Sequence, residues 1–156
     1  IEGRFDAFDV AIDEREVACV VVRQADDLML WTVPLAASGG IGRQRIAGTA
    51  SRRLVSPPIL GKSLRVLILD SGMIALTLDG KRAWERRSIP TGGASMMSDD
   101  HLLVADNGKI LDVDPRGKST EIYADKDVVF TTAPILSANG TLYVASGELL
   151  HAISFN

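Results

Sequence analysis

The sequence contains few of the residues that carry most protein chemistry. Of its 156 residues one is cysteine, two are histidine and 5% are aromatic. A single cysteine excludes an intrachain disulfide and a thiolate metal cluster, and Cys19 lies in the β-prone run Val17–Val22, where a buried, inert thiol is expected. Because aromatic residues are scarce, aliphatic side chains and methionine must fill most of the core.

The chain also lacks a strong charge and a long apolar run. Its net charge of -3 argues against a general nucleic-acid binder, for which a clustered basic face is expected. The main basic concentration is Arg43, Arg45, Arg52 and Arg53, and a solvated surface loop is its simplest interpretation. No apolar segment approaches the ~20 residues that a membrane-spanning helix needs, so no membrane span is expected.

The first four residues, Ile1–Arg4, match a protease recognition site that is commonly built into expression vectors. We therefore expect them to be a remnant of cloning that replaces the natural N-terminus. A single cysteine fits the cytoplasm and does not exclude an exported protein, so the composition leaves the compartment open.

Several short patterns invite a functional interpretation, but each has a simpler one. Gly39–Gly42 lacks the spacing and the following helix of a dinucleotide-binding loop, and is expected to be a plain loop. Asp112–Gly117 is half of a calcium loop without its closing glutamate, and is expected to be a β-turn. The remaining candidates are expected to have ordinary structural roles: Asp26 and Asp27, Asp99 and Asp100, His101, and His151. We therefore assign no catalytic, cofactor-binding or metal-binding residue and no cofactor.

The stretch 56–84 provides the structural organisation. Its prolines, Pro57 and Pro58, suit a strand start, and the short strand Ile59-Leu60 follows them. The aliphatic run Leu64–Leu69 is too continuous for a strand with one wet face and predicts a strand that is covered on both sides. A turn at 70–72 leads into a third strand, 73–78. A second turn at 79–80 leads into a polar, solvent-side strand, 81–87.

This unit repeats. Asp70-Ser71-Gly72 recurs as Asp106-Asn107-Gly108 after 36 residues and as Ala145-Ser146-Gly147 after a further 39. Before it, strands are expected at 8–12, 17–22, 28–33 and about 43–47. A period near 38 that consists of strands and turns indicates an all-β, β-propeller-like fold of about four blades with three to four antiparallel strands each. The expected division is one domain over 5–156, with blades at about 5–53, 54–90, 91–128 and 129–156.

The units resemble the repeats of the pyrroloquinoline-quinone-like, or quinoprotein-type, β-propeller family. Ala75–Trp84 is similar to the family's Ala-Leu-Asp-x-x-Gly-x-x-x-Trp, with Thr77 in place of the aspartate. In the next unit Asp114 restores the aspartate, but Glu121 stands where tryptophan is expected. The last unit, Leu150–Ser154, is similar to Leu-Tyr-Ala-Leu-Asp. The resemblance covers about 54–155 well and 8–50 poorly, and it implies a bacterial protein in the periplasm or outside the cell.

The resemblance leaves two main hypotheses, and a third in which the chain is a structural half-ring whose role is self-assembly. A non-catalytic binding or scaffold module would recognise a protein, peptide or glycan through loops at one face of the ring. Alternatively, the chain is a fragment of a quinoprotein-type dehydrogenase or another propeller enzyme whose active groups lie elsewhere. Four units allow a four-bladed ring, a partial ring, or a ring that a second copy completes. The strand at 8–12 could also supply the missing outer strand of the last unit.

Overall fold

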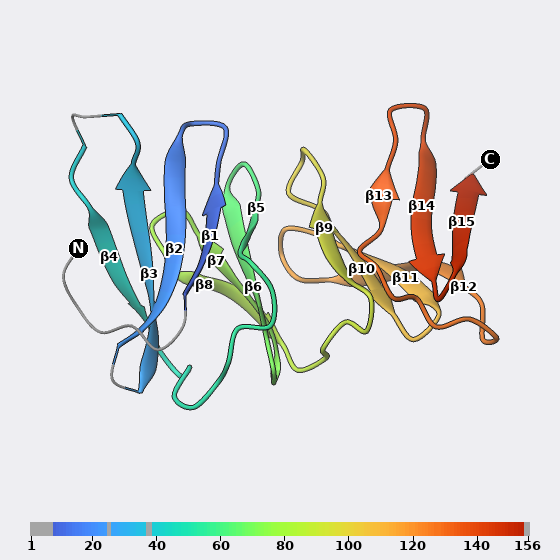
Figure 1. Cartoon of the computed structure of the whole chain (residues 1–156), viewed down its shortest axis with the longest axis horizontal. Coiled ribbons are helices and arrows are strands. Elements are labelled where there is room, and N and C mark those ends of the chain that lie inside the picture. Colours follow the sequence, from blue (N-terminus) through green and yellow to red (C-terminus); the bar gives the residue numbers. More distant parts are fainter. Residues whose placement is uncertain (1–7, 25, 37–38, 155–156) are drawn as a thin grey trace.

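The computed structural model describes residues 8–24, 26–36 and 39–154, and within them the chain forms fifteen strands and no helix. Ile1–Arg4 lies outside the described residues. The strands form four antiparallel sheets in chain order, and each sheet is a simple meander (Figure 1). The all-β prediction and the division into sheets of three to four strands are confirmed.

The first two sheets lie in the N-terminal half. Their strands are β1 (Phe8–Ile12), β2 (Val17–Gln24), β3 (Asp27–Pro34), β4 (Gly42–Ile46), β5 (Ile59–Leu60), β6 (Leu64–Leu69), β7 (Gly72–Thr77) and β8 (Arg82–Arg86). The other two sheets consist of β9 (Gly93–Met96), β10 (Leu102–Asp106), β11 (Lys109–Val113), β12 (Ser119–Ala124), β13 (Ile135–Leu136), β14 (Thr141–Ser146) and β15 (Leu149–Ser154).

Three apolar clusters join consecutive sheets face to face. The first packs β2 and β3 against β6 and β7, the second packs the second sheet against β10, and the third packs β10 against β14. Because alternate residues of a strand point to opposite faces, β6 and β10 each contribute to two clusters. All six residues of β6 are buried, so the prediction of a strand covered on both sides is confirmed.

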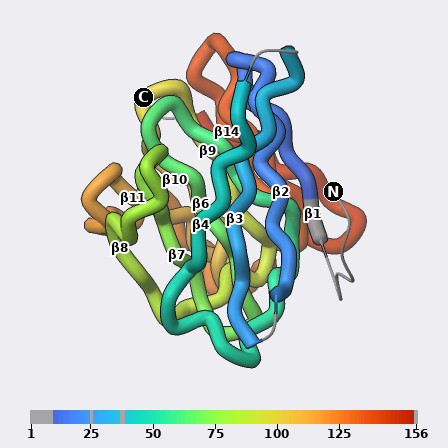
Figure 2. Tube along the Cα trace, turned by 90° about the vertical axis from the view of Figure 1, so that its left-hand side faces the viewer, coloured from blue at the N-terminus to red at the C-terminus, as the bar shows by residue number. Residues whose placement is uncertain are grey.

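The sheets form a row rather than a visibly closed ring. Figure 1 shows the first and fourth sheets at opposite ends of the long axis of the molecule, and Figure 2 looks onto the face of the first sheet that points away from the second. The strand β1 pairs with β2 in the first sheet. The structure therefore places it there, and not beside β15 in the last sheet.

The turn motif of the repeats has a local explanation. Asp114 begins the turn between β11 and β12, and its Oδ1 accepts hydrogen bonds from the backbone N–H of Arg116 and of Lys118, each at 2.9 Å. In the second sheet Thr77 takes the same place, and its hydroxyl donates to the carboxylate of Asp79. The Thr77 hydroxyl and then the Lys81 ammonium lower the pKa of Asp79 to about 2. A hydroxyl thus replaces the usual aspartate without loss of the turn.

The outer strand β8 is largely exposed, as predicted for a solvent-side strand, and Trp84 is its one buried residue. Trp84 is only 8% exposed, because it packs against the next sheet. Gly117 of that sheet has a φ of +86°, and a Cβ there would lie 2.7 Å from Cγ of Trp84. Gln44 of β4 fills the equivalent place against Gly80 of the second sheet. The conformation of each turn glycine and the residue that faces it therefore fix how neighbouring sheets pack.

Candidate functional site

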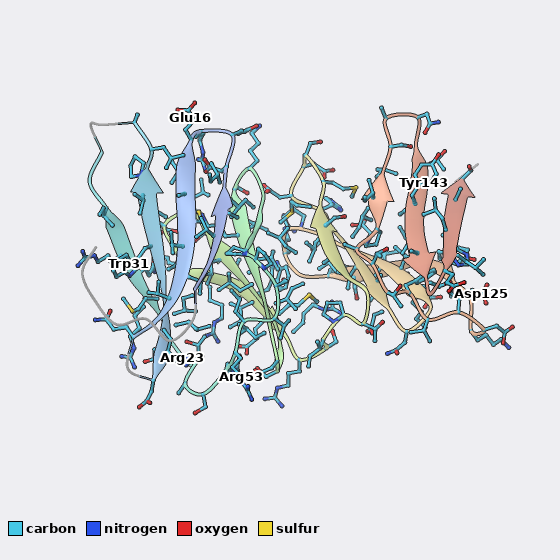
Figure 3. The ribbon with its side chains drawn as sticks, viewed as in Figure 1. Glu16, Arg23, Trp31, Arg53, Asp125 and Tyr143 are labelled. Atoms are coloured by element: carbon cyan, nitrogen blue, oxygen red, sulfur yellow. The ribbon has the colours of Figure 1, made fainter. Side chains whose placement is uncertain are left out.

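The first strands of the sheets, β1, β5, β9 and β13, line one edge of the row, which we call the inner edge. Each is an edge strand of its own sheet, and β5 contacts both β1 and β9. The turn that follows each first strand lies at the same end of the molecule, as Figure 1 shows. In Figure 3 Glu16 marks this end, and Arg23 and Arg53 lie at the opposite one. The inner edge therefore gathers four short segments that are far apart in the sequence.

Three of these turns have the same backbone geometry. In each, a residue with positive φ precedes the next strand: Glu16 at 56°, Asp100 at 66° and Gly140 at 83°. The backbone N–H and C=O of the first turn residue both form hydrogen bonds with backbone groups across the turn. These first residues are Asp13, Met97 and Ser137. The turn between β5 and β6 is tighter, and Gly61 N–H donates to Leu64 O at 2.8 Å. This difference leaves space beside Gly61 for the neighbouring turn.

Asp100 fills that space and joins two turns. Its carboxylate accepts hydrogen bonds from the Ser63 backbone N–H at 2.9 Å and from Ser63 Oγ at 2.5 Å. Asp100 is 6% exposed, and a Cβ on Gly61 would collide with its carboxylate. A buried carboxylate needs such hydrogen bonds to offset its lost hydration. Asp100 thus holds the second and third sheets in a fixed relation at the inner edge, and it is not available as a catalytic carboxylate.

Three depressions follow the inner edge, and Met96 lines all of them. The first, of about 460 Å³, lies among the turns of the first three sheets, with Leu60 and Met97 in its wall. The second, of about 630 Å³, lies between the third and fourth sheets beside Leu136. The third, of about 590 Å³, lies between β5 and β9. Met96 is therefore the point at which the three depressions meet.

The walls of the second and third depressions are mainly apolar, whereas the wall of the first is mainly polar and carries charged side chains. Ile12 and Ile135 are 61% and 65% exposed, although both are large apolar side chains. Asp13, Glu14, Arg15 and Lys62 line the first depression. Burial would raise the pKa of Asp13, but the Arg15 side chain and two backbone N–H groups outweigh it and lower that pKa. The Asp13 carboxylate is thus committed to its own turn.

His101 and Asp112 form a hydrogen-bonded pair at this end of the molecule. His101 Nδ1 lies 2.7 Å from Asp112 Oδ1, and the two side chains are 32% and 27% exposed. The hydrogen bond that the His101 ring donates to the Asp112 carboxylate is the main cause that raises the pKa of His101. Asp99 and Leu103, which flank the pair in sequence and register, line the second depression. An oriented imidazole in this environment is chemically suited to accept or donate a proton.

The other residues that the sequence singled out lie apart from one another. Cys19 is completely buried, and its Sγ accepts a hydrogen bond from Nε of the buried Arg65 at 3.0 Å. His151 Nε2 is paired with Ser146 Oγ at 2.6 Å, and its ring packs edge-on against Phe130. The two histidines thus have separate partners. In the part of the chain that the structure describes, no three His, Cys, Asp or Glu side chains are grouped to hold a metal ion.

The basic and glycine-rich segments also have local roles. Arg43 lies over the Trp31 ring, 4.7 Å from its centre, and Arg45 pairs with Asp27. Both arginines lie on β4, whereas Arg52 and Arg53, on the connection to the second sheet, pair with Glu85 and Asp70. The segment Gly39–Gly42 leads directly into β4 and not into a helix. Over residues 8–24, 26–36 and 39–154, we find no helix of the length and apolarity that crossing a membrane requires.

Sequence reasoning did not identify the inner edge. Met96 and Met97 are not among the candidates above, although Met-Met before a polar turn is a visible signal of a soft apolar surface. Arg65 was not singled out either, because a buried arginine inside an aliphatic strand has no local sequence signature.

No protein-family model and no curated protein sequence matches this chain. Solved structures do match it. BamB from Moraxella catarrhalis is similar with a TM-score of 0.64 and 16% identity, over 93% of this chain and 45% of that one. A streptogramin B lyase is similar with a TM-score of 0.62 and 12% identity, over 94% of this chain and 51% of that one. A catalytically inactive histidine-to-alanine variant of virginiamycin B lyase from Staphylococcus aureus, solved with quinupristin, has a TM-score of 0.58 and 15% identity, over 94% and 55% of the two chains.

These identities are low, so the likeness concerns the fold alone. The chain spans about half the length of the solved proteins that it matches. The four consecutive sheets have the arrangement of neighbouring blades, and the chain has a β-propeller-like fold.

Proposed function

We propose that residues 5–156 form one β-propeller-like binding module, which recognises a protein or peptide with apolar side chains along the inner edge. The observation that carries this proposal is that three depressions converge on Met96. Methionine is flexible and polarizable, so it adapts to partner side chains of different shape. The exposed Ile12, Ile135 and Leu136 extend the same apolar surface.

An extended peptide suits this surface better than a sugar. The first strands are edge strands, and an extended segment can lie along such edges while its side chains enter the depressions. None of the described residues that line the three depressions is aromatic, so a platform for stacking a sugar ring is missing from this lining. We also propose that the sheets are repeats of the quinoprotein type. The Thr77 turn and the contact between Trp84 and Gly117 support this assignment.

A random-peptide display library, panned against the immobilised chain, tests this function. We expect enriched peptides to be apolar and to lose at least about tenfold in affinity for Met96→Asp, since a charge replaces an apolar contact. The matched control is Ile89→Asp, because Ile89 is 44% exposed and lines none of the three depressions. Peptides that bind both variants equally, or no enrichment over an unrelated protein, would reject the inner edge as the binding site.

A second candidate function is acid–base catalysis by His101. The observation that favours it is the 2.7 Å contact between His101 Nδ1 and Asp112 Oδ1, which orients the ring. Two of the similar structures are lyases, and one is an inactive histidine variant. Incubation of the chain with quinupristin, with His101→Gln as the control, tests this candidate: turnover that the substitution abolishes would support it, and unchanged quinupristin would reject lyase activity of this chain on it.

The quinoprotein alternative stays a prediction. Titration of the chain with pyrroloquinoline quinone and Ca²⁺, followed by absorbance, tests it directly. A saturable spectral change would favour an enzyme fragment over a binding module.

A further inference from the structure

The first strand of the third sheet, β9, has one paired edge and one free edge. It pairs with β10 and is the last strand in the order of its sheet. Met97 N–H donates to His101 O at 2.8 Å, and bonded pairs alternate with unbonded pairs along an antiparallel ladder. The register therefore makes Ser95 the next bonded residue, and Ala94 and Met96 turn their N–H and C=O groups to the free edge.

These four backbone groups are a template for a further strand. Within residues 8–24, 26–36 and 39–154, no hydrogen bond of the chain reaches them. Unpaired groups along a strand edge readily pair with another extended segment. The neighbouring first strands β5 and β13 have only two residues each, whereas β9 has four and lies between them on the inner edge (Figure 1). The free edge of β9 is therefore the longer template at the centre of the inner edge.

Two of the depressions lie on opposite faces of the third sheet. The third depression is on the face towards the second sheet, beside Ile59 and Leu60, and the second is on the face towards the fourth sheet, beside Leu136. The side chains of β9 alternate in the same way, since Met96 packs against the cluster shared with the second sheet and Met97 against the one shared with the fourth. A strand added to β9 would therefore place alternate side chains in the two depressions.

We propose that an extended peptide binds as an additional strand on the free edge of β9, with its side chains alternately in the third and the second depression. This inference rests on the proposed function and specifies how the inner edge holds its partner. In this mode of recognition, backbone hydrogen bonds supply affinity and pockets for alternate side chains supply specificity. The free groups of Ala94 and Met96 are two residues apart, which is the spacing of bonded residues in an added antiparallel strand.

The linings of the two depressions define the side chains of the partner. The described lining of the third depression contains no charged residue, and the described lining of the second contains one, Asp99. The depressions are also staggered along β9, because Gly92 and Gly93 at its start line the third and Ser98 beyond its end lines the second. The partner should therefore carry consecutive large apolar residues, one for each face, and a basic side chain near Asp99.

N-methylation of a synthetic peptide tests the strand pairing on the wild-type chain. The probe is the most enriched sequence from the display library, and each of its backbone nitrogens is methylated in turn. We expect the affinity to fall at least about tenfold at alternate positions, because the methyl group removes an N–H donor and blocks the edge. Methylation at the intervening positions, whose N–H groups point away from β9, should change the affinity less than about threefold.

A second measurement assigns the side chains. Leu136→Ala in the second depression and Ile59→Ala in the third should each weaken binding. In double-mutant cycles with an alanine scan of the peptide, the coupling should alternate between these two variants along the peptide sequence. Asp99→Asn should weaken only peptides with a basic residue. Ile89→Ala is the control outside the depressions, and circular dichroism establishes that each variant is folded.

The outcomes separate this inference from the proposed function. A loss of affinity for Met96→Asp without any effect of N-methylation would overturn the strand pairing and leave binding through side chains at the inner edge. A periodic effect of N-methylation that Met96→Asp leaves unchanged would place the peptide on another free edge, such as that of β15, and would overturn both. The absence of any enriched peptide would likewise overturn both.

Discussion

The second and fourth sheets are formed by different copies of the same repeat, yet their residues are buried to different extents. In the second sheet all of β6 is buried, because both of its faces pack against other sheets. In the fourth sheet β15 has no completely buried residue, and Leu149 and Leu150 are 66% and 71% exposed. Similar strands thus have different environments, and the neighbouring sheets decide which residues become core. The stability of such an array is largely a sum of terms between neighbours.

The largest expected difference is between two leucines. Leu67→Ala removes a completely buried side chain at the junction of the first two sheets and should cost about 3 kcal/mol of unfolding free energy. Leu150→Ala, measured at a concentration where the chain is monomeric, should change it by less than about 0.5 kcal/mol. Urea denaturation of both variants measures the two values. Equal costs would contradict the comparison between the sheets.

Two turn glycines sharpen the comparison. Gly117 and Gly140 have nearly the same φ, +86° and +83°, but only Gly117 faces a neighbouring side chain, Trp84 at 2.7 Å. Gly140→Ala should cost about 1 kcal/mol from its backbone conformation alone. Gly117→Ala carries the same backbone cost and in addition displaces Trp84, so we expect about 1–3 kcal/mol more. Thermal unfolding, with tryptophan fluorescence as a second probe, should separate them, and equal losses would show that Trp84 adjusts freely.

The sequence predicted what local patterns determine. Aliphatic runs and turn signals predicted the eight strands of the first two sheets to within a few residues, because apolar period and turn chemistry act over short distances. The strand β12 was not specified, since its first residues, Ser119, Thr120 and Glu121, are polar and do not alternate. Its bulge also sets the register in which Glu121 pairs with Leu111, and Ile122 packs against the third cluster. A bulge of this kind is not visible in a motif that is aligned by spacing alone.

The candidate site was harder to predict than the strands. Met96 gains its importance from three sheets that meet around it, and Asp100 from Ser63, which lies in another repeat. The sequence of a single repeat indicates neither the surroundings of Met96 nor the contact between Asp100 and Ser63. The contact between His101 and Asp112 follows from the register between β10 and β11. The sequence alone did not predict that register.

The junction at the inner edge should be weaker than the apolar junctions. Ser63→Ala removes the hydroxyl that donates to Asp100 at 2.5 Å and leaves the backbone N–H bond, so we expect a loss of about 1 kcal/mol. Ser71→Ala is the control, because Ser71 is exposed in the turn between β6 and β7 and should show almost no effect. Chemical denaturation measures both. A loss above that of Leu67→Ala would mean that polar contacts, and not the clusters, hold the second and third sheets together.

The smallest expected effect concerns the pH dependence of the third sheet. Because Asp112 raises the folded-state pKa of His101 above its unfolded value near 6.5, the pair adds stability below that pH and loses it as pH rises through the folded pKa. Between about pH 5.5 and pH 8.5 the wild-type chain should therefore lose more of this contribution than Asp112→Asn, in which the imidazolium has no carboxylate partner. Histidine resonances in an NMR titration should show the pKa of His101 falling in Asp112→Asn. Since both side chains are about a third exposed, solvent screens the pair and the change in melting temperature should be small. An unchanged His101 titration would mean that the ring is not held by Asp112 in solution, which would also remove the observation that favours acid–base catalysis.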